Sequence, residues 1–337
     1  MLSVGGYFGG GVGYDQIQPN WTVSASIGKN ATVDAAADVI LNSTLKNSVH
    51  SYAVAVSASA GAALSGAASR INETSTSSAS IDGTVSAGGS VVVAADRNGK
   101  LNTLDGNGAV GLGAAGVGLS LSMITANDTV EASIGPNGNV TALGQGSPIS
   151  APTGGFDDNG DPVLAPSLQG LSVSAMNYSS LKPLAVGAAA SGGVAVDGSV
   201  IVNTLTESTS AKIQGGAIVN GDNAGAADGQ SVNVLASDTT NMNDLAGALS
   251  VSLGAGIGAA ADAGNIKKTT TAGIDNGAAV HAKGAVTVDA LSEETIKSIV
   301  AAVGGALTVS GHGRLLSRSE ECSAGVRAGS GVRFLCN

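Results

Sequence analysis

The sequence has few of the large side chains from which compact protein cores are usually built. Aromatic residues make up 2 % of the chain and charged residues 12 %, while Gly occurs 51 times in 337 residues. The apolar 43 % consists mostly of Ala and Val. Burial free energy scales with apolar area, so this composition disfavours helix bundles and doubly wound α/β folds. It favours thin, closely packed β layers.

Basic residues are also scarce. The chain has 15 Lys and Arg against 25 Asp and Glu, which gives a net charge of −10. Nucleic-acid binding needs clustered basic residues, and the same charge disfavours anionic lipid. We expect neither as a partner. No targeting signal opens the chain and no apolar run of 18 residues occurs, so no membrane span is predicted.

A short segment ending in isoleucine recurs along the chain. It reads SASI, SASI, EASI, SAKI and TAGI, and it ends at Ile27, Ile81, Ile134, Ile213 and Ile274. The spacings are 54, 53, 79 and 61 residues. The longest spacing contains a Pro-rich insertion of 26 residues at 145–170, without which it falls to 53. The spacing of 61 contains an acidic Gly-rich segment at 220–229. The chain therefore holds about five units of roughly 53 residues.

Each isoleucine is followed by alternating apolar residues. One unit has Val85, Ala87, Val91, Val93 and Ala95, and the same period of two returns in the other units. This period predicts strands. Further along, Leu249, Val251 and Leu253 alternate with Ser and Gly, so something is expected to pack closely against the bare Ser/Gly face.

A single unit of this kind cannot bury its apolar face alone, which favours stacking. The sequence thus predicts an all-β fold, a repetitive parallel β-solenoid in which one unit makes about two coils and the insertions leave as loops. An array of β-sandwiches is the alternative.

The pattern I-(D/G)-x-(G/N), V-x-A-x-G-x-V-x-V-x-A, an alternating Gly/Ala-rich strand and N-x-x-T resembles the repeat region of large filamentous adhesins of Gram-negative bacteria, of the leukotoxin and filamentous-haemagglutinin types. The resemblance covers about residues 1–311. It implies a right-handed β-helix fibre, export through an outer-membrane partner, and adhesion at the cell surface. It implies no catalytic residues for this chain.

The chemical motifs are weak. GLGAAG at 111–116 matches a dinucleotide-binding fingerprint, which requires a helix directly after it. The residues that follow alternate between apolar and Gly or Ser, which predicts a strand. No histidine has a nucleophile or acid at motif spacing, so no catalytic residue is predicted. Three charged residues, Asp96, Arg97 and Asp238, fall at corresponding positions of different units. We interpret these positions as turns between strands, where the charges form a solvated edge.

One candidate metal site lies in the first insertion. Four oxygen-bearing side chains on a Gly/Pro-containing loop suit Ca²⁺, a hard cation, although the EF-hand register fails. A solvated acidic loop is the alternative. The candidate ligands are Asp157, Asp158, Asn159 and Asp161. No other cofactor is predicted.

The last 26 residues differ from the repeats. Residues 312–337 contain four of the six arginines and both cysteines, Cys322 and Cys336, with a net charge of +2. We expect repeats over 1–311 and a non-repeat tail over 312–337, either read out of frame or an atypical cap.

These observations lead to a structural and adhesive function. We expect a fragment of a large exported surface fibre, secreted or on the surface of a Gram-negative bacterium, whose loops at 145–170 and 220–229 bind a host-cell or matrix surface, either glycan or protein. A β-helix enzyme acting on polysaccharide is one alternative, and a non-functional gene fragment is another.

Overall fold

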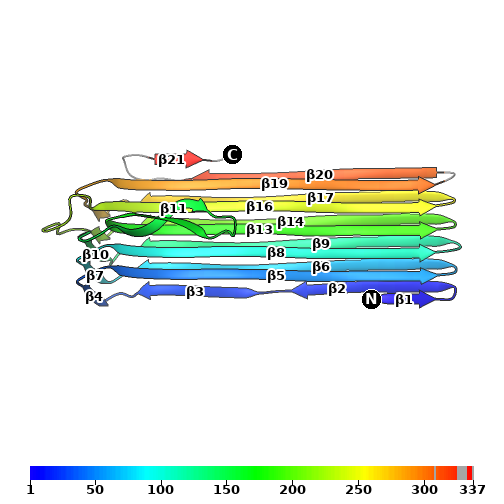
Figure 1. The fold of residues 1–337 in the computed structure, drawn as a ribbon, viewed down its shortest axis with the longest axis horizontal. Helices are drawn as coiled ribbons and strands as arrows, with labels where there is room; N and C mark the ends of the chain where they lie inside the picture. The colour runs from blue at the N-terminus through cyan, green and yellow to red at the C-terminus, as the bar shows by residue number, and fades with distance from the viewer. Residues whose placement is uncertain (307–308, 325–331, 336–337) are drawn as a thin grey trace.

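The long strands stack in parallel into a flat solenoid (Figure 1). The computed structural model describes residues 1–306, 309–324 and 332–335, with side chains for 1–306, and the described residues form strands and turns with no helix. Two large parallel sheets, here sheets A and B, face each other, and a narrow third sheet, C, closes one end. The all-β parallel solenoid predicted from the sequence is confirmed.

The strands are assigned to the sheets as follows. Sheet A contains β1 (Leu2–Gly5), β5 (Val39–Ser59), β8 (Val91–Gly111), β13 (Gly170–Ser191), β16 (Ser231–Ser252), β19 (Val286–Ala306) and β21 (Val332–Leu335). Sheet B contains β2 (Phe8–Ile17), β3 (Asn20–Ile27), β6 (Ala62–Ile81), β9 (Ala115–Ile134), β14 (Val194–Ile213), β17 (Ala255–Ile274) and β20 (Val309–Ala324). Sheet C contains β4 (Thr32–Ala35), β7 (Thr84–Ala87), β10 (Asn139–Ala142), β15 (Ile218–Val219) and β18 (Ala279–Val280).

One repeat makes one coil. The chain runs along β5, reverses through two residues into β6 on the opposite sheet, crosses the end as β7, and returns as β8 directly beside β5. The prediction of two coils per unit is wrong. Strands of about 20 residues, each roughly 66 Å long at the usual rise, take up the whole unit in one wide turn.

The recurring isoleucines form a continuous column in sheet B. Ile27 pairs in register with Ile81, Ile81 with Ile134, and Ile134 and Ile274 both with Ile213. This column packs against the alternating Val and Ala residues of sheets A and C in one buried core. The period-two pattern therefore identified the core at the end that sheet C closes, which we call the wide end.

The opposite end, which we call the turn end, is built the other way round. Its interior holds small residues such as Ala53, Ala55 and Ala67. Buried serines there donate to carbonyls across the interior, as Ser65 Oγ does to Ala55 O at 2.7 Å. Leu249 and Val251 point outward and are exposed. The Ser/Gly face thus meets the opposing sheet, as expected, while the larger apolar residues face away from the core.

The tight turns stack on one another through glycine. A Cβ on Gly193 would lie 2.3 Å from the carbonyl oxygen of Ala114 in the coil before it. A Cβ on Gly254 would lie 2.4 Å from the carbonyl oxygen of Gly193. No side chain fits at these distances, so the backbone spacing of the turns requires glycine.

The first insertion is a hairpin and not a loop. β11 (Ile149–Phe156) and β12 (Pro162–Leu168) pair antiparallel and lie against the outer face of sheet A. Ala151 and Leu168 cover Val92 and Ala94 of β8 in a small buried cluster. The outward Val92 and Ala94 at the wide end therefore have a cover, whereas Ile40 on β5 stays exposed. The second insertion, 220–229, contains turns and no strand.

The region expected to be a non-repeat tail partly continues the stack. β20 pairs with β17 from Val309 to Ala324, and β21 pairs with β19. Cys336 lies outside the described residues, as does the side chain of Cys322. The interpretation of this tail as out of frame stays a prediction.

We expect Ile134→Ala to destabilise the solenoid by about 3 kcal/mol, the usual cost of truncating a fully buried Ile. Ile134 is completely buried between its counterparts in the neighbouring coils. Ile257→Ala, at an exposed position of the same sheet, is the matched control and should change stability by less than about 0.5 kcal/mol. Urea unfolding followed by circular dichroism measures both, and equal losses would contradict the inferred core.

Candidate binding surface and buried ionic network

The predicted calcium ligands lie at the tip of the hairpin. Asp157 Oδ1 accepts the backbone N–H groups of Asn159 at 2.9 Å and Asp161 at 2.8 Å. Asp161 is bound by Lys46 Nζ at 2.8 Å and Asn98 Nδ2 at 3.0 Å. These hydrogen bonds, with Lys46 first, lower the pKa of Asp161. Two of the four expected ligands are therefore engaged within the chain.

The exposed Asp158 is the third carboxylate of this set. Across residues 1–306, no group of three or more His, Cys, Asp or Glu side chains has an arrangement that holds a metal ion. Calcium binding at the hairpin tip stays a prediction from the sequence. The geometry does show what the tip does without a metal: it is fastened to β5 through Lys46 and to β8 through Asn98.

A polar cleft separates the hairpin tip from the outer face of sheet A. It has a volume of about 270 Å³. Its lining residues are Lys46, Asn47, Ser48, Asn98, Lys100, Asn159 and Asp161. A shallow groove of about 460 Å³ lies further along the same strands and includes His50, Tyr52, Asn102 and Lys182. The rings of His50 and Tyr52 are stacked, 6.2 Å apart.

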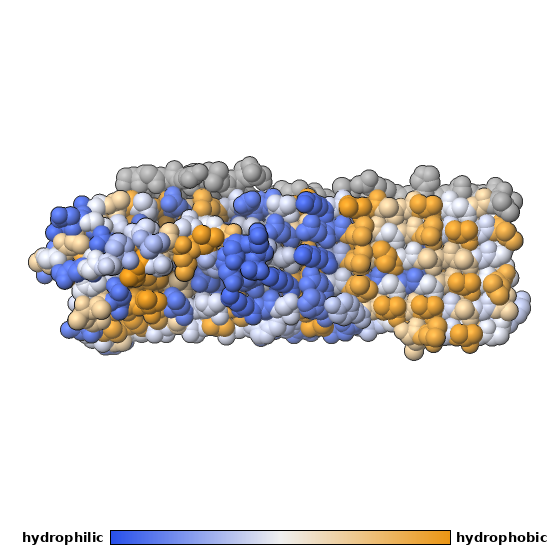
Figure 2. Space-filling model, in the orientation of Figure 1, coloured by the Kyte–Doolittle hydropathy of each residue, from blue (hydrophilic) through white to orange (hydrophobic). Residues whose placement is uncertain are grey.

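The cleft and the polar side of the groove form one polar strip across sheet A, and Tyr52, Leu104, Leu184 and Leu245 line the other side of the groove. Figure 2 shows hydrophilic residues gathered over the middle of this face, with apolar columns beyond them toward the turn end. Amide, ammonium and hydroxyl groups line the strip, and Tyr52 is 63 % exposed. This surface offers hydrogen-bond donors and an aromatic ring to a ligand from solvent.

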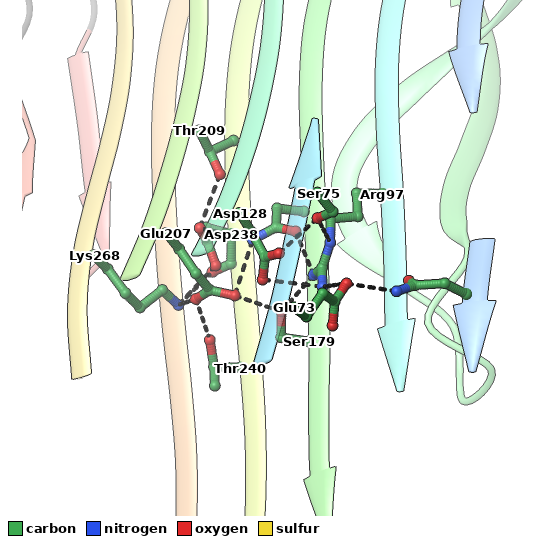
Figure 3. Close-up of polar contacts among 12 residues, drawn as sticks. Glu73, Ser75, Arg97, Asp128, Ser179, Glu207, Thr209, Asp238, Thr240 and Lys268 are labelled. Carbon is green, nitrogen blue, oxygen red and sulfur yellow. Dashed lines mark hydrogen bonds and ion pairs between the residues drawn. The ribbon is translucent and has the colours of Figure 1, made fainter. Parts of the chain in front are cut away.

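A buried ionic network crosses the interior between the two sheets (Figure 3). Arg97 on β8 is 2 % exposed, and its Nη2 lies 3.0 Å from Glu73 Oε1 and 3.0 Å from Asp128 Oδ2. Arg97 also donates to Ser75 Oγ at 2.6 Å and to Ser179 Oγ at 2.8 Å. Its guanidinium is therefore bound by groups from β6 and β9 of sheet B and from β13 of sheet A.

Two coils further on, Lys268 takes the corresponding role. Its Nζ lies 2.8 Å from Asp238 Oδ1 and 3.0 Å from Glu294 Oε1. Glu207 also accepts from Thr240 at 2.7 Å, and Asp238 accepts from Thr209 at 2.8 Å. Asn177 joins the halves, since it accepts from Arg97 and donates to Glu207 and Asp238.

The prediction that Asp96, Arg97 and Asp238 lie in solvated turns is wrong, because all three lie within long strands. Arg97 and Asp238 also point into the interior. The repeat itself indicates that their partners in the network are buried. Asp128, Glu207 and Lys268 each precede the recurring isoleucine of their unit by six residues. Side chains an even number of residues apart in a strand share a face, so these three must face inward with the isoleucines.

Gly99 makes room for the guanidinium. A Cβ at this position would lie 2.3 Å from Nη2 of Arg97 and 2.5 Å from its Cζ. Its neighbours in the column are Asn47 and Ser179, which both reach the network. The glycine therefore allows a full guanidinium to lie within a layer of strands.

Carboxylates outnumber cations in this network. Glu73, Asp128, Glu207 and Asp238 are each at most 3 % exposed, against Arg97 and Lys268. Burial, with the nearby Asp238, raises the pKa of Glu207 to about 8. Burial raises the pKa of Asp128 to about 7 although Arg97 opposes it. Burial disfavours the two cations, but Asp128 raises the pKa of Arg97 and Asp238 that of Lys268 above their ordinary values.

A second set of interior acids lies nearer the turn end. Burial raises the pKa of Asp105 to about 7 and that of Asp197 to about 6. Burial and the neighbouring Asp262 raise the pKa of Asp244 to about 8. Polar side chains accompany them: Ser69 donates to Asp105 at 2.5 Å and Asn203 to Asp244 at 2.8 Å. The interior therefore holds several carboxyl groups that are neutral in part near pH 7.

Comparison with known proteins identifies no relative. No family model, no curated protein and no solved structure matches the chain. None of the described residues forms a helix with the length and apolarity needed to cross a membrane.

We expect Arg97→Ala to destabilise the chain by about 3–5 kcal/mol, because it leaves Glu73 and Asp128 buried without their cation. Lys46→Ala removes the exposed ion pair with Asp161 and should cost less than about 1 kcal/mol. Urea unfolding compares the two variants. Similar small losses would show that Arg97 is not bound as described.

We also expect stability to decrease as pH rises from 5 to 8. The ordinary pKa values are 3.8 for Asp and 4.5 for Glu, and the raised values reach about 8. Between these limits the folded chain binds more protons than the unfolded chain, so the free energy of unfolding falls as pH rises. Glu207 alone should contribute at least about 1.4 kcal/mol, the equivalent of one pKa unit.

Thermal unfolding at several pH values measures this dependence. Glu207→Gln should flatten it, because the amide does not titrate, while Asp158→Asn at the exposed hairpin tip should leave it unchanged. Stability that rises with pH in the wild-type chain would contradict the assignment.

Proposed function

We propose that this chain is a structural and adhesive segment of a large surface fibre, which binds a host-cell or matrix surface through its hairpin and the adjoining polar strip. The observation that carries the proposal is the polar cleft between the hairpin tip and sheet A. A stacked scaffold holds both walls of this cleft, and Lys46 and Asn98 fasten the tip to it.

The chemistry of the strip favours a glycan with acidic groups as the ligand. Lys100 and the Lys46–Asp161 ion pair line the cleft and leave it one net positive charge, and Asn102 supplies an amide, while Asn98 is bound to the hairpin tip. Tyr52 offers an exposed ring beside them. These are the groups that bind the hydroxyls, carboxylates and apolar faces of sugars. The resemblance of the repeats to those of filamentous adhesins supports a place outside a Gram-negative cell.

The buried network lends no support to a polysaccharide-cleaving enzyme. Such an enzyme needs acids and bases that a substrate reaches from solvent. Arg97, Glu207 and Lys268 are at most 2 % exposed, and neighbouring residues occupy their polar atoms. Their arrangement suits a structural role between the sheets.

The test is binding of the purified chain to cultured epithelial cells and to an array of acidic glycans. Lys46→Ala with Lys100→Ala should lower binding at least about tenfold, because it removes the cleft's charge. The control is Lys29→Ala with Lys212→Ala. It removes the same number of positive charges at positions outside the cleft, and it should bind as the wild type does.

Equal binding by both double variants would place the ligand elsewhere on the chain. Binding to cells but to no glycan would replace the glycan with a protein ligand. No binding to cells or matrix by the wild-type chain would overturn the adhesive function.

A further inference from the structure

Three neighbouring columns of outward side chains on sheet A contain basic residues and no acidic ones. The columns follow from the in-register pairing of β5, β8, β13, β16 and β19. They hold three lysines and a histidine, although the whole chain has a net charge of −10. From the wide end toward the turn end, the columns are Ser48, Lys100, Ser180, Asn241 and Thr295; His50, Asn102, Lys182, Asn243 and Lys297; and Tyr52, Leu104, Leu184, Leu245 and Ile299.

The middle column alternates between basic and amide side chains. His50, Lys182 and Lys297 follow one another at every second coil. Asn102 and Asn243 occupy the coils between them. Two coils span about 9.6 Å at the usual strand spacing. A ligand that lies along this column therefore meets a basic group at every second coil and an amide in between.

The middle column and the apolar column beside it form the two sides of the shallow groove. The groove has a volume of about 460 Å³, and its lining residues come from four successive coils, through β5, β8, β13 and β16. It therefore runs along the stack and across the strands. Figure 2 shows the same boundary, where a hydrophilic band meets apolar columns. A groove in this direction suits a narrow, chain-like ligand that makes a new set of contacts at each coil.

The charge in this groove is less compensated than that in the cleft at the hairpin tip. In the cleft, Asp161 binds Lys46. The ion pairs within residues 1–306 do not include Lys182 or Lys297, and both lysines are exposed. On this face Glu293 lies in the next column toward the wide end, outside the three columns. The groove therefore attracts an anionic ligand.

We infer that the groove binds a linear polysaccharide that lies along the stack and carries an acidic group on every second sugar. This inference rests on the proposed adhesive function and assigns its ligand class and position. The coils are about 4.8 Å apart, and one pyranose of an extended polysaccharide has roughly this length. Successive sugars therefore meet successive coils.

Each side of the groove has a partner on such a chain. The lysine ammonium groups bind the carboxylates of the acidic sugars. The amides of Asn102 and Asn243 both donate and accept hydrogen bonds, which suits the hydroxyl groups of the neutral sugars between them. Tyr52 and the leucines of the apolar column offer surface to the apolar faces of the rings.

Isothermal titration calorimetry with hexasaccharides tests the inference. Hyaluronan hexasaccharide, in which acidic and neutral sugars alternate, should bind at least about tenfold more tightly than the neutral hexasaccharide of N-acetylglucosamine, because only the first pairs with the lysines. Lys182→Ala and Tyr52→Ala should each weaken hyaluronan binding at least about fivefold. Lys29→Ala, at an exposed lysine outside the groove, and Tyr14→Ala are the matched controls and should bind as the wild type does. Tyr14 is 61 % exposed, against 63 % for Tyr52, but lies on sheet B.

Asn243→Lys tests the alternation, because it places a third cation between Lys182 and Lys297. This variant should gain more affinity for hexagalacturonate, which has a carboxylate on every sugar, than for the hyaluronan hexasaccharide. An equal gain for both would overturn the alternating ligand. Circular dichroism verifies that each variant keeps its fold.

The remaining outcomes separate this inference from the proposed function. Hyaluronan binding that is lost in Lys46→Ala with Lys100→Ala but unchanged in Lys182→Ala would place the glycan in the cleft, which overturns the inference and keeps the adhesive function. Binding to cells without binding to the hyaluronan hexasaccharide would do the same. A DNA oligonucleotide that binds as tightly as hyaluronan would show that the groove attracts any polyanion, and it would overturn the inference. A wild-type chain that binds no cells or matrix overturns the proposed function itself.

Discussion

The in-register hydrogen bonding of each coil to the next determines almost everything else in this molecule. Parallel pairing continues without a break along most of each long strand, from β5 to β8 and from β14 to β17. Each residue therefore has the same inward or outward direction as its partner in the neighbouring coil. The isoleucine column, the buried charges and the outward apolar columns all follow from this one constraint, because a slip of a single residue would exchange the two faces.

The interior changes character along the strands while the backbone stays the same. Branched apolar residues fill the wide end, charged groups such as Arg97 and Glu207 cross the middle, and Ala and Ser fill the turn end. The charged layer fixes which coil lies opposite which, because each cation is paired with carboxylates of the opposite sheet at a defined height. Buried polar groups often contribute specificity in this way when they are fully hydrogen-bonded. The Ala-rich end, which has little apolar area to bury inside, relies more on backbone pairing.

Much of the fold could be predicted from the sequence, because period and spacing determine it directly. The isoleucines gave the repeat, and the alternation from Val85 to Ala95 gave strands and core. The number of coils per unit could not be read from the repeat length, which does not say where a strand turns. The interior position of Arg97 and Asp238 is at odds with the usual exposure of charged residues, although their even spacing from core residues indicates the interior. The cleft beside the hairpin depends on Lys46 and Asp161, which are 115 residues apart, and no local pattern relates them.

The hairpin also limits how many appendages a stack of such coils can carry on one face. From one insertion it reaches Lys46 on β5, Val92 on β8, Tyr178 on β13, Ser237 on β16 and Leu291 on β19. Five successive coils, about 24 Å of the stack at the usual strand spacing, thus lie under a single appendage. A second hairpin of this size has no room on the same face within that distance. The smallest distance between two such hairpins on this face is therefore set by the width of one hairpin and not by the repeat length of the sequence.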